Sequence, residues 1–424
     1  MSPLFLLRRE KYASGFWQRL GFLPEFEADG KTVVWIHCVS VGETNAARPL
    51  VEKLKQEFPE HKIVISTTTK TGQKLAREIF AEIADLVFYF PYDWKFSVRR
   101  ALNKIKPNNV LIMETEIWFR FLRESYKNGT QNILVNGRLS EKSAKNYSLI
   151  RSFMKRALHY FDLTLMQSQN DARHLINLGI RSRKVKITGN IKFDQDFKQN
   201  ESDLTENLRR RFNISNDSPL IIAASTHSPE EKLIFEAFTK VWKNSPDKLP
   251  RLLIAPRHPE RFADVEKQIR ETGFDWVKRS KKASARDKSA EIILLDSIGE
   301  LRQVLPLAEI VFVGGSLIPH GGQNIIEPAI SKKAIITGHY TRNFEAIVKE
   351  FLENEALIQL PKLNENEVSE YLSNVIEELL ENSEKREKLA QNALAVMKKN
   401  RGATEKTFQY LKPFLEGKVE RRGY

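Results

Sequence analysis

Carboxylates follow apolar runs at two places in the first half of the chain. Glu43 comes shortly after the apolar residues 33–37 and directly behind Gly42, which permits a sharp turn. Glu114 and Glu116 follow the apolar residues 110–113. A carboxylate whose pKa is raised towards neutrality acts as a general base, whereas a glutamate in the first turn of a helix also complements the helix dipole. Three roles therefore remain open for these residues: a general base, a contact to substrate hydroxyls, or simply the start of a helix.

Anion-binding groups follow other apolar runs in the same way. Arg138 comes after residues 133–135, and Arg257 with His258 comes after residues 252–255. A guanidinium at the end of a strand suits a phosphate leaving group, because it neutralises the charge that develops on departure. Ser225, Thr226 and His227 precede a helix start at Pro229 in the sequence, so we expect free N–H groups there to point at a ligand.

A glycine-rich stretch has the pattern of a strand, a loop and a helix. The apolar residues 310–313 are followed by Gly314-Gly315, a second pair at Gly321-Gly322, and a predicted helix with Glu327 in its first turns. In an α/β protein such a loop lets backbone N–H groups approach a phosphate. The alternative is a tight turn without a ligand.

The elements around these residues predict an α/β fold. Short apolar runs alternate with amphipathic segments, which is typical of doubly wound parallel sheets. We expect strands at residues 33–37, 62–66, 86–89, 110–113, 133–135, 163–166 and 185–187, then at 220–223, 252–255, 292–295, 310–313, 334–336 and 357–358. A polar stretch at 194–217 separates the two series. We expect a Rossmann-like domain at 1–200, a second at 217–405, a terminal helix at 406–424 that can return to the first domain, and a cleft between the domains.

Composition limits the classes of partner. The net charge of +14 is concentrated in residues 1–200, which carry 33 Lys and Arg against 20 Asp and Glu. The positive electrostatic field of these residues would attract an anionic partner, which can be nucleic acid, an anionic membrane or a phosphorylated substrate. The single cysteine excludes an internal disulfide, and the scattered histidines argue against a structural metal site.

The beginning of the chain is basic and aromatic. Residues 1–23 mix phenylalanines and a tryptophan with arginines and a lysine, as in segments that lie on a membrane surface, although packing on the domain beneath is equally expected. We expect neither a transmembrane helix nor a signal peptide.

Taken in order, these stretches resemble the 3-deoxy-D-manno-octulosonic acid (Kdo) transferases of lipopolysaccharide and lipid A biosynthesis. The similarity extends from about residue 11 to about residue 344. It is carried by eight ordered motifs, namely Val39-Ser-Val-Gly-Glu43, Met113-Glu-Thr-Glu-Ile-Trp118, Arg138-Leu-Ser140, Gly189-Asn-Ile-Lys-Phe-Asp194, Ser225-Thr-His227, Pro256-Arg-His-Pro-Glu-Arg-Phe262, Gly299-Glu-Leu301 and Phe312-Val-Gly-Gly-Ser-Leu317.

The resemblance implies a GT-B fold and an inverting, metal-independent transfer of Kdo from CMP-Kdo to a phosphorylated lipid A precursor (lipid IVA), without a cofactor. It implies Glu43 as catalytic base. Donor contacts are expected from Ser225, Thr226, His227, Arg257, His258, Gly299, Glu300, Leu301, Gly314, Gly315, Asn324 and Glu327. Contacts to the acceptor or to the Kdo carboxylate are expected from Glu114, Glu116, Arg138 and Lys192. The expected location is the cytoplasmic face of the bacterial inner membrane, with peripheral or weak N-terminal attachment.

The chain departs from the family pattern at three places. Gln323 stands where the family usually has histidine, Phe119-Arg120 stand where Pro-Asn is common after the tryptophan, and many members begin with a longer hydrophobic anchor.

Two alternatives remain open. One is another GT-B transferase or epimerase that uses a UDP-sugar. The other is a catalytically idle carbohydrate- or nucleic-acid-binding protein, for which the sequence lacks an aromatic and basic module such as an RRM signature.

Overall fold

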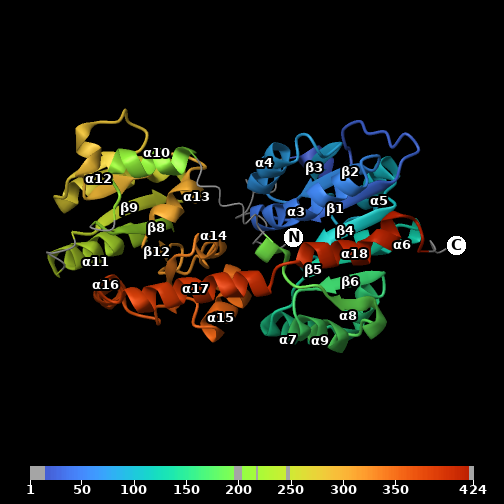
Figure 1. The fold of residues 1–424 in the computed structure, drawn as a ribbon. Helices are drawn as coiled ribbons and strands as arrows, with labels where there is room; N and C mark the ends of the chain where they lie inside the picture. The colour runs from blue at the N-terminus through green and yellow to red at the C-terminus, as the bar shows by residue number, and fades with distance from the viewer. Residues whose placement is uncertain (1–14, 195–202, 216–217, 245–248, 420–424) are drawn as a thin grey trace. The chain divides into compact units, whose positions relative to one another are not determined.

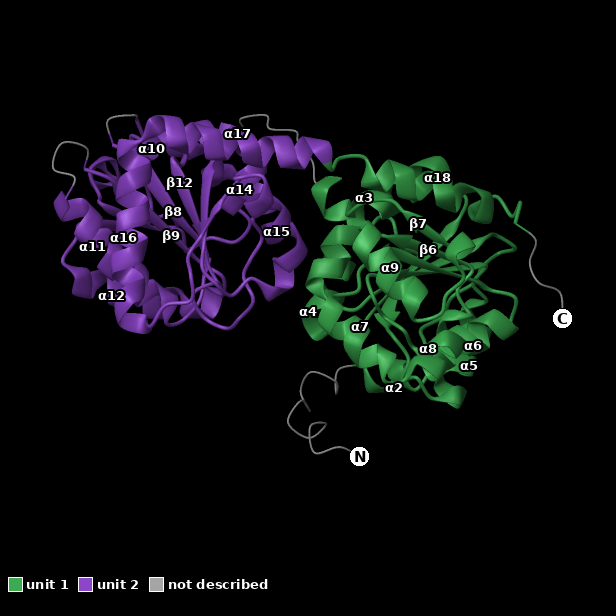
Figure 2. Cartoon of the chain, turned by 90° about the horizontal axis from the view of Figure 1, so that it is seen from below, with its two compact units in different colours: residues 1–195, 400–424 green, residues 196–399 purple. Residues whose placement is uncertain are grey.

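The computed structural model describes residues 15–194, 203–215, 218–244 and 249–419 of the 424-residue chain. The chain forms two compact units (Figures 1 and 2). Unit 1 holds residues 1–195 and 400–424, and unit 2 holds residues 196–399. The chain therefore leaves unit 1 once and returns to it near residue 400. Residues 1–14, which include most of the basic and aromatic start, lie outside the described residues.

The centre of unit 1 is a parallel seven-stranded sheet with the order β3-β2-β1-β4-β5-β6-β7. Each residue of β1 is buried, because helices cover both faces of the sheet and a strand so covered reads as a continuous apolar run. The strands are β1 (Val33–Cys38), β2 (Lys62–Thr67), β3 (Leu86–Tyr89), β4 (Asn109–Met113), β5 (Gln131–Gly137), β6 (Leu163–Met166) and β7 (Val185–Ile187).

Alternate residues of β1 face two hydrophobic cores. Val33 and Trp35 pack with α5, α6, α8 and α9. Val34, Ile36 and Cys38 pack with α3, α4 and α18. The helices of unit 1 are α2 (Phe16–Arg19), α3 (Val41–Glu57), α4 (Lys70–Ile79), α5 (Lys95–Ile105), α6 (Phe119–Lys127), α7 (Glu141–Ser148), α8 (Arg151–Leu158), α9 (Gln169–Asn177) and α18 (Ala403–Leu415).

The returning segment is fixed to unit 1 at the start of α18. The Asp194 carboxylate accepts hydrogen bonds from the backbone N–H groups of Gly402, at 2.6 Å, and of Thr404. Free N–H groups at a helix start are stabilised by such an acceptor. Phe408 and Leu411 of α18 then bury their side chains in the core beside α3.

Unit 2 repeats the plan with the strand order β10-β11-β9-β8-β12-β13-β14, again all parallel. The strands are β8 (Leu220–Thr226), β9 (Arg251–Pro256), β10 (Trp276–Lys278), β11 (Ile292–Leu294), β12 (Ile310–Val313), β13 (Ala334–Thr337) and β14 (Ile358–Gln359). One core buries side chains of these strands against α11, α12 and α16. The helices are α10 (Asp203–Phe212), α11 (Glu230–Asn244), α12 (Phe262–Thr272), α13 (Leu301–Val304), α14 (Ile326–Ile330), α15 (Glu345–Glu353), α16 (Glu365–Glu381) and α17 (Ser383–Lys399).

The α/β prediction with two parallel sheets is confirmed, with three differences in detail. The strand β10 was not predicted, because its three residues, Trp276–Lys278, form too short a run to show a period. The stretch expected to be a polar linker contains the helix α10, so unit 2 begins before residue 217. Unit 2 ends at residue 399 rather than at 405.

Each sheet has one position where the strand order reverses. In unit 1, β1 lies between β2 and β4, and in unit 2, β8 lies between β9 and β12. Open α/β sheets bind ligands at such positions, beyond the carboxyl ends of the strands. In unit 1 the loops at this position carry Glu43 and Glu114, and in unit 2 they carry Ser225–His227 and Gly314-Gly315.

Candidate active site

The loop between β1 and α3 buries the Glu43 carboxylate. Glu43 is 7% exposed, and its carboxylate accepts a hydrogen bond from the backbone N–H of Val39 at 2.7 Å and another from Ser40 Oγ at 3.2 Å. Burial and the charge of Glu114 raise the pKa of Glu43 to about 8, although both hydrogen bonds favour the ionised form. A carboxyl group with a pKa near the working pH suits proton abstraction from a hydroxyl.

The loop after β4 holds a second buried carboxylate, paired with two cations. Glu114 has a left-handed backbone, with φ 57, and receives Lys192 Nζ on one oxygen and Arg138 Nε on the other, each at 2.7 Å. Burial alone would raise the pKa of Glu114, but Lys192 and Arg138 outweigh it and hold that pKa below its ordinary value. Glu114 therefore keeps its negative charge beside Glu43.

Glu116 completes the predicted residues of unit 1. Burial and the neighbouring charge of Glu114 raise its pKa to about 7. The structure thus brings Glu43, Glu114, Glu116, Arg138 and Lys192 into one electrostatic group. Arg138 and Lys192, which were expected to bind an anion of the substrate, already pair with Glu114. The Arg138 side chain is nevertheless 43% exposed, so part of its guanidinium remains open to a ligand.

In unit 2, His227 lies on the loop after β8, and two histidines from the loops after β9 and β12 lie close to its ring. The His227 ring centroid lies 4.0 Å from that of His320 and 5.2 Å from that of His258. Gln323 Nε2 lies 2.9 Å from His227 Nε2. Burial lowers the pKa of His227 to about 4, and the neighbouring histidines and Arg257 add to that effect. His227 is therefore neutral at physiological pH, while Arg257 and His258 are exposed.

The backbone N–H groups of residues 314–317 donate to acceptors within the chain, and the expected donor contacts of Gly314 and Gly315 stay a prediction. The N–H groups of Gly315, Ser316 and Leu317 all donate to the buried Glu230 carboxylate, and that of Gly314 donates to the carbonyl of Ala224. The glycines permit close packing. A Cβ on Gly314 would lie 2.7 Å from the carbonyl oxygen of Ser225, and one on Gly338 would lie 2.3 Å from that of Ser316.

The remaining predicted donor residues are held by their own neighbours. Asn324 Nδ2 donates to Glu327 at 3.3 Å, and burial raises the pKa of Glu327 although Arg302 and Asn324 oppose this. The Glu300 carboxylate accepts from Arg279, at 2.9 Å, and from Ser297, at 2.5 Å.

Gly299, with φ 86, precedes the short helix α13, and Leu301 is the first residue of that helix. No cluster of His, Cys, Asp and Glu suited to a metal ion occurs in the described parts of the chain.

Sequence reasoning missed Glu230 and His320. His320 adjoins the glycine pair Gly321-Gly322, and that position was a usable signal. Glu230 begins α11 and reads as an ordinary N-terminal glutamate. Nothing local in the sequence indicates that its carboxylate bonds a loop 85 residues further on.

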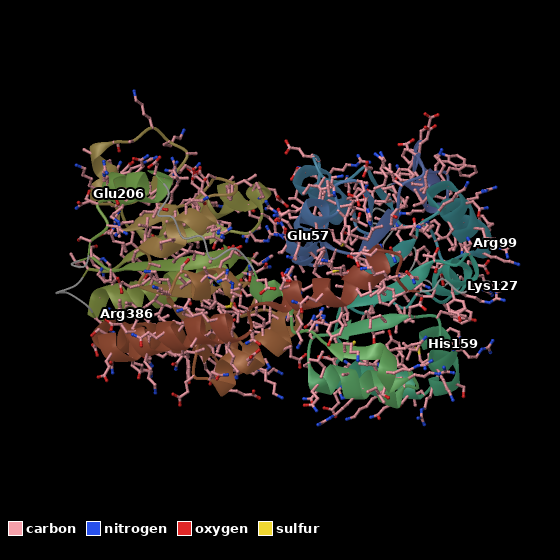
Figure 3. The ribbon with its side chains drawn as sticks, turned by 45° about the vertical axis from the view of Figure 1, so that its right-hand side comes forward. Glu57, Arg99, Lys127, His159, Glu206 and Arg386 are labelled. Atoms are coloured by element: carbon pink, nitrogen blue, oxygen red, sulfur yellow. The ribbon has the colours of Figure 1, made fainter. Side chains whose placement is uncertain are left out.

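A group of exposed aromatic side chains lies on α2, α5 and the segments beside them. We call it the α2–α5 aromatic surface: Phe16, Trp17, Phe22, Trp94 and Phe96, each 48–66% exposed. The guanidinium of Arg100 lies 4.4 Å from the ring centre of Phe22 and 5.8 Å from that of Phe96, so the two segments adjoin. Arg99, on the same helix, reaches the surface (Figure 3). Among the helices described, none is both long and apolar enough to cross a bilayer.

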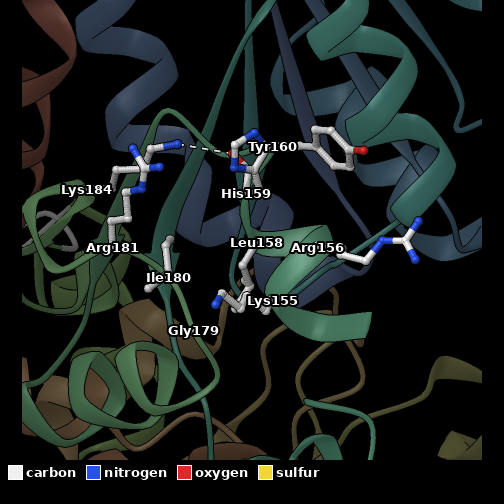
Figure 4. Close-up of a pocket in the computed structure, with 9 residues that line it drawn as sticks. All are labelled: Lys155, Arg156, Leu158, His159, Tyr160, Gly179, Ile180, Arg181 and Lys184. Carbon is white, nitrogen blue, oxygen red and sulfur yellow. Dashed lines mark hydrogen bonds between the residues drawn. The ribbon is translucent and has the colours of Figure 1, made fainter. Parts of the chain in front are cut away.

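A basic pocket of about 400 Å³ in unit 1 lies apart from the predicted residues (Figure 4). It is formed where α8 ends and where β7 begins, and therefore at the amino ends of the strands. Lys184 Nζ donates there to the carbonyls of His159, at 3.1 Å, and Phe161. Lys184 thus provides a donor to backbone carbonyls just beyond the end of α8. None of the predicted site residues lines this pocket.

The chain is similar to known proteins over nearly its whole length. Residues 14–195 match the family described as 3-deoxy-D-manno-octulosonic-acid transferase (kdotransferase). The chain is 32% identical to the 3-deoxy-D-manno-octulosonic acid transferase of Haemophilus influenzae, with 98% of this chain and 95% of the relative aligned. It is 28% identical to the enzyme of that name from Chlamydia trachomatis, with 95% and 90% aligned.

The solved structures give the fold. The UDP-GlcNAc 2-epimerase of Neisseria meningitidis, bound to UDP-GlcNAc, matches with a TM-score of 0.60 and 14% identity, over 90% of this chain and 99% of that one. This likeness places the two parallel sheets in the GT-B architecture, and the sequence similarity identifies the family. The chain belongs to the 3-deoxy-D-manno-octulosonic acid transferases.

Proposed function

We propose that the protein transfers Kdo from CMP-Kdo to a lipid A precursor, lipid IVA, by an inverting reaction in which Glu43 is the general base. This proposal rests on the surroundings of Glu43. Its carboxylate is buried and hydrogen-bonded on both oxygens, and its pKa is raised to about 8. The membership of the family supports the donor and the class of acceptor.

In the proposed reaction, a hydroxyl of the acceptor gives its proton to the Glu43 carboxylate. The hydroxyl oxygen bonds to the anomeric carbon of Kdo, and the bond from that carbon to the phosphate oxygen of CMP breaks. Glu114 keeps its charge through Lys192 and Arg138 and so raises the basicity of Glu43.

The donor is held by residues of unit 2. Arg257 and His258 are exposed after β9 and are proposed to contact the phosphate of CMP, together with Ser225, Thr226 and His227. Asn324 and Glu327 are proposed to contact the ribose, and residues 299–301 to border the cytosine. The reaction as proposed requires neither a metal ion nor a cofactor.

The acceptor is a phosphorylated lipid, so the protein must reach a membrane. We assign this contact to the α2–α5 aromatic surface, because exposed aromatic rings beside arginines bind the headgroup region of anionic membranes. The proposed location is the cytoplasmic face of the inner membrane, with peripheral attachment.

A donor screen tests the proposal. The purified protein with lipid IVA should release CMP from CMP-Kdo and leave UDP-GlcNAc and other UDP-sugars unchanged. Consumption of a UDP-sugar without turnover of CMP-Kdo would contradict it.

A further inference from the structure

Glu230 lies at the start of α11 with its carboxylate fully buried. One carboxylate oxygen accepts hydrogen bonds from the backbone N–H groups of His227, at 3.0 Å, and Gly315, at 2.6 Å. The other accepts from those of Ser316, at 2.9 Å, and Leu317, at 2.8 Å. Four backbone donors from two loops therefore converge on a single anion.

Successive backbone N–H groups around an anion form the arrangement with which glycine-rich loops bind phosphates. In this protein the anion is supplied by the chain itself. Burial raises the pKa of Glu230, and all four hydrogen bonds oppose that rise by favouring the charged carboxylate.

We propose that Glu230 occupies the anion position of the glycine loop and thereby makes the donor site select a nucleotide with one phosphate over a nucleoside diphosphate. This inference rests on the proposed function, because it assigns a reason for the use of a CMP-sugar. Glu230 is a positioning and specificity residue rather than a catalytic one, since it is buried beneath His227 and Gly315.

The physical argument concerns the second phosphate of a diphosphate. It would approach a loop whose N–H groups from Gly314 to Leu317 are all engaged, and it would meet the negative charge of Glu230. An anion near a like charge in a poorly solvated site is disfavoured. A single phosphate, in contrast, is served by the exposed Arg257 and His258.

The wild-type protein gives the first test, by calorimetric titration with CMP and with CDP. The second phosphate should be disfavoured beside Glu230, so CDP should bind about threefold or more weakly than CMP. CDP binding within about threefold of CMP binding, or tighter, would overturn this proposal alone. Binding of neither nucleotide would overturn the proposed function, and this proposal with it.

The variant Glu230→Ala gives the second test. It leaves four donors around an empty position, so inorganic phosphate should raise its melting temperature far more than that of wild type, and the ratio of CDP to CMP affinity should rise by about tenfold or more. Glu231→Ala is the matched control. Glu231 is equally buried on the same helix, but it accepts from the side chains of Thr226 and Arg261.

The control should lose stability without rescue by phosphate and without a change in the affinity ratio. An unchanged ratio in a folded Glu230→Ala variant would overturn the proposal. If that variant does not fold, the comparison of CMP with CDP on the wild-type protein decides.

Discussion

Glu43→Gln separates the charge of Glu43 from its shape. A glutamine keeps the size of the side chain, can accept from Val39 N–H and can donate to Ser40 Oγ, so the loop between β1 and α3 should keep its conformation. The pKa of Glu43 rises from 4.5 to about 8 on folding, so the folded protein binds a proton that the unfolded chain releases between these values. Stability contributed by this group is complete below pH 4.5 and is lost as the pH rises to about 8.

The size of the effect follows from that shift. Between pH 5 and pH 7 the wild type should lose about 3 kcal/mol of stability relative to Glu43→Gln, because each pH unit inside the window corresponds to about 1.4 kcal/mol. Hydrogen exchange of the β1 and β4 amides reports on unit 1 alone, and comparison at each pH cancels the intrinsic exchange rate. A difference that stays constant across this range would refute the assigned burial and charge of Glu43.

The same variant tests catalysis. Loss of a general base should lower turnover by about 10²–10⁴-fold while CMP binding persists. In the wild type, kcat/KM should rise with pH and level off above about 8, since the base must be ionised. Turnover within tenfold of wild type in Glu43→Gln would remove Glu43 from the proposed role.

Three further changes test the surroundings. Lys192→Ala should destabilise unit 1 by about 3 kcal/mol, because it leaves the buried Glu114 with only one cation. The control Lys145→Ala breaks an exposed ion pair and should cost less than about 0.5 kcal/mol. Equal effects of the two changes in hydrogen exchange would contradict this. The double change Trp94→Ser and Phe96→Ser should weaken binding to anionic vesicles, measured by sedimentation, by about tenfold or more, whereas the control Tyr371→Ser on unit 2 should not. Unchanged binding of the double variant would exclude the α2–α5 aromatic surface as the membrane contact. Gln323→His places a titratable ring beside His227, so calorimetry should find that CMP binding strengthens as the pH falls through about 6.5. A pH dependence of CMP binding equal to that of the wild type would contradict this role of Gln323.

The sequence predicted the parts of the fold that rest on local patterns. Thirteen strands were expected from apolar runs bounded by polar or glycine residues, and all are present near the expected positions. The loops at the ends of β1, β4 and β8 could be named in advance, because parallel strands place their carboxyl ends at one edge. The strand β10 was missed because a run of three residues shows no period. The helix α10 was missed although Leu204, Leu208 and Phe212 recur at every fourth residue, because the stretch around them is polar and charged.

The contacts within the site could not be predicted in the same way. Arg138 and Lys192 read as cations for a ligand, but both pair with Glu114, which lies 24 and 78 residues away in the sequence. The glycine loop read as an empty phosphate site, and its N–H groups are occupied by Glu230. Both cases have one cause, which is that a residue type reveals its charge while only the fold determines which partner neutralises it.

The proposed reaction is defined by the group that is transferred and by the lipid that accepts it. Mass spectrometry of lipid IVA incubated with the protein and CMP-Kdo tests it most directly. We expect the lipid to gain the mass of one or more Kdo residues, with release of one CMP for each, and we expect Glu43→Gln to form this product about 10²–10⁴-fold more slowly. Lipid IVA that stays unmodified in the presence of CMP-Kdo and acquires a sugar from a UDP-sugar instead would contradict the account.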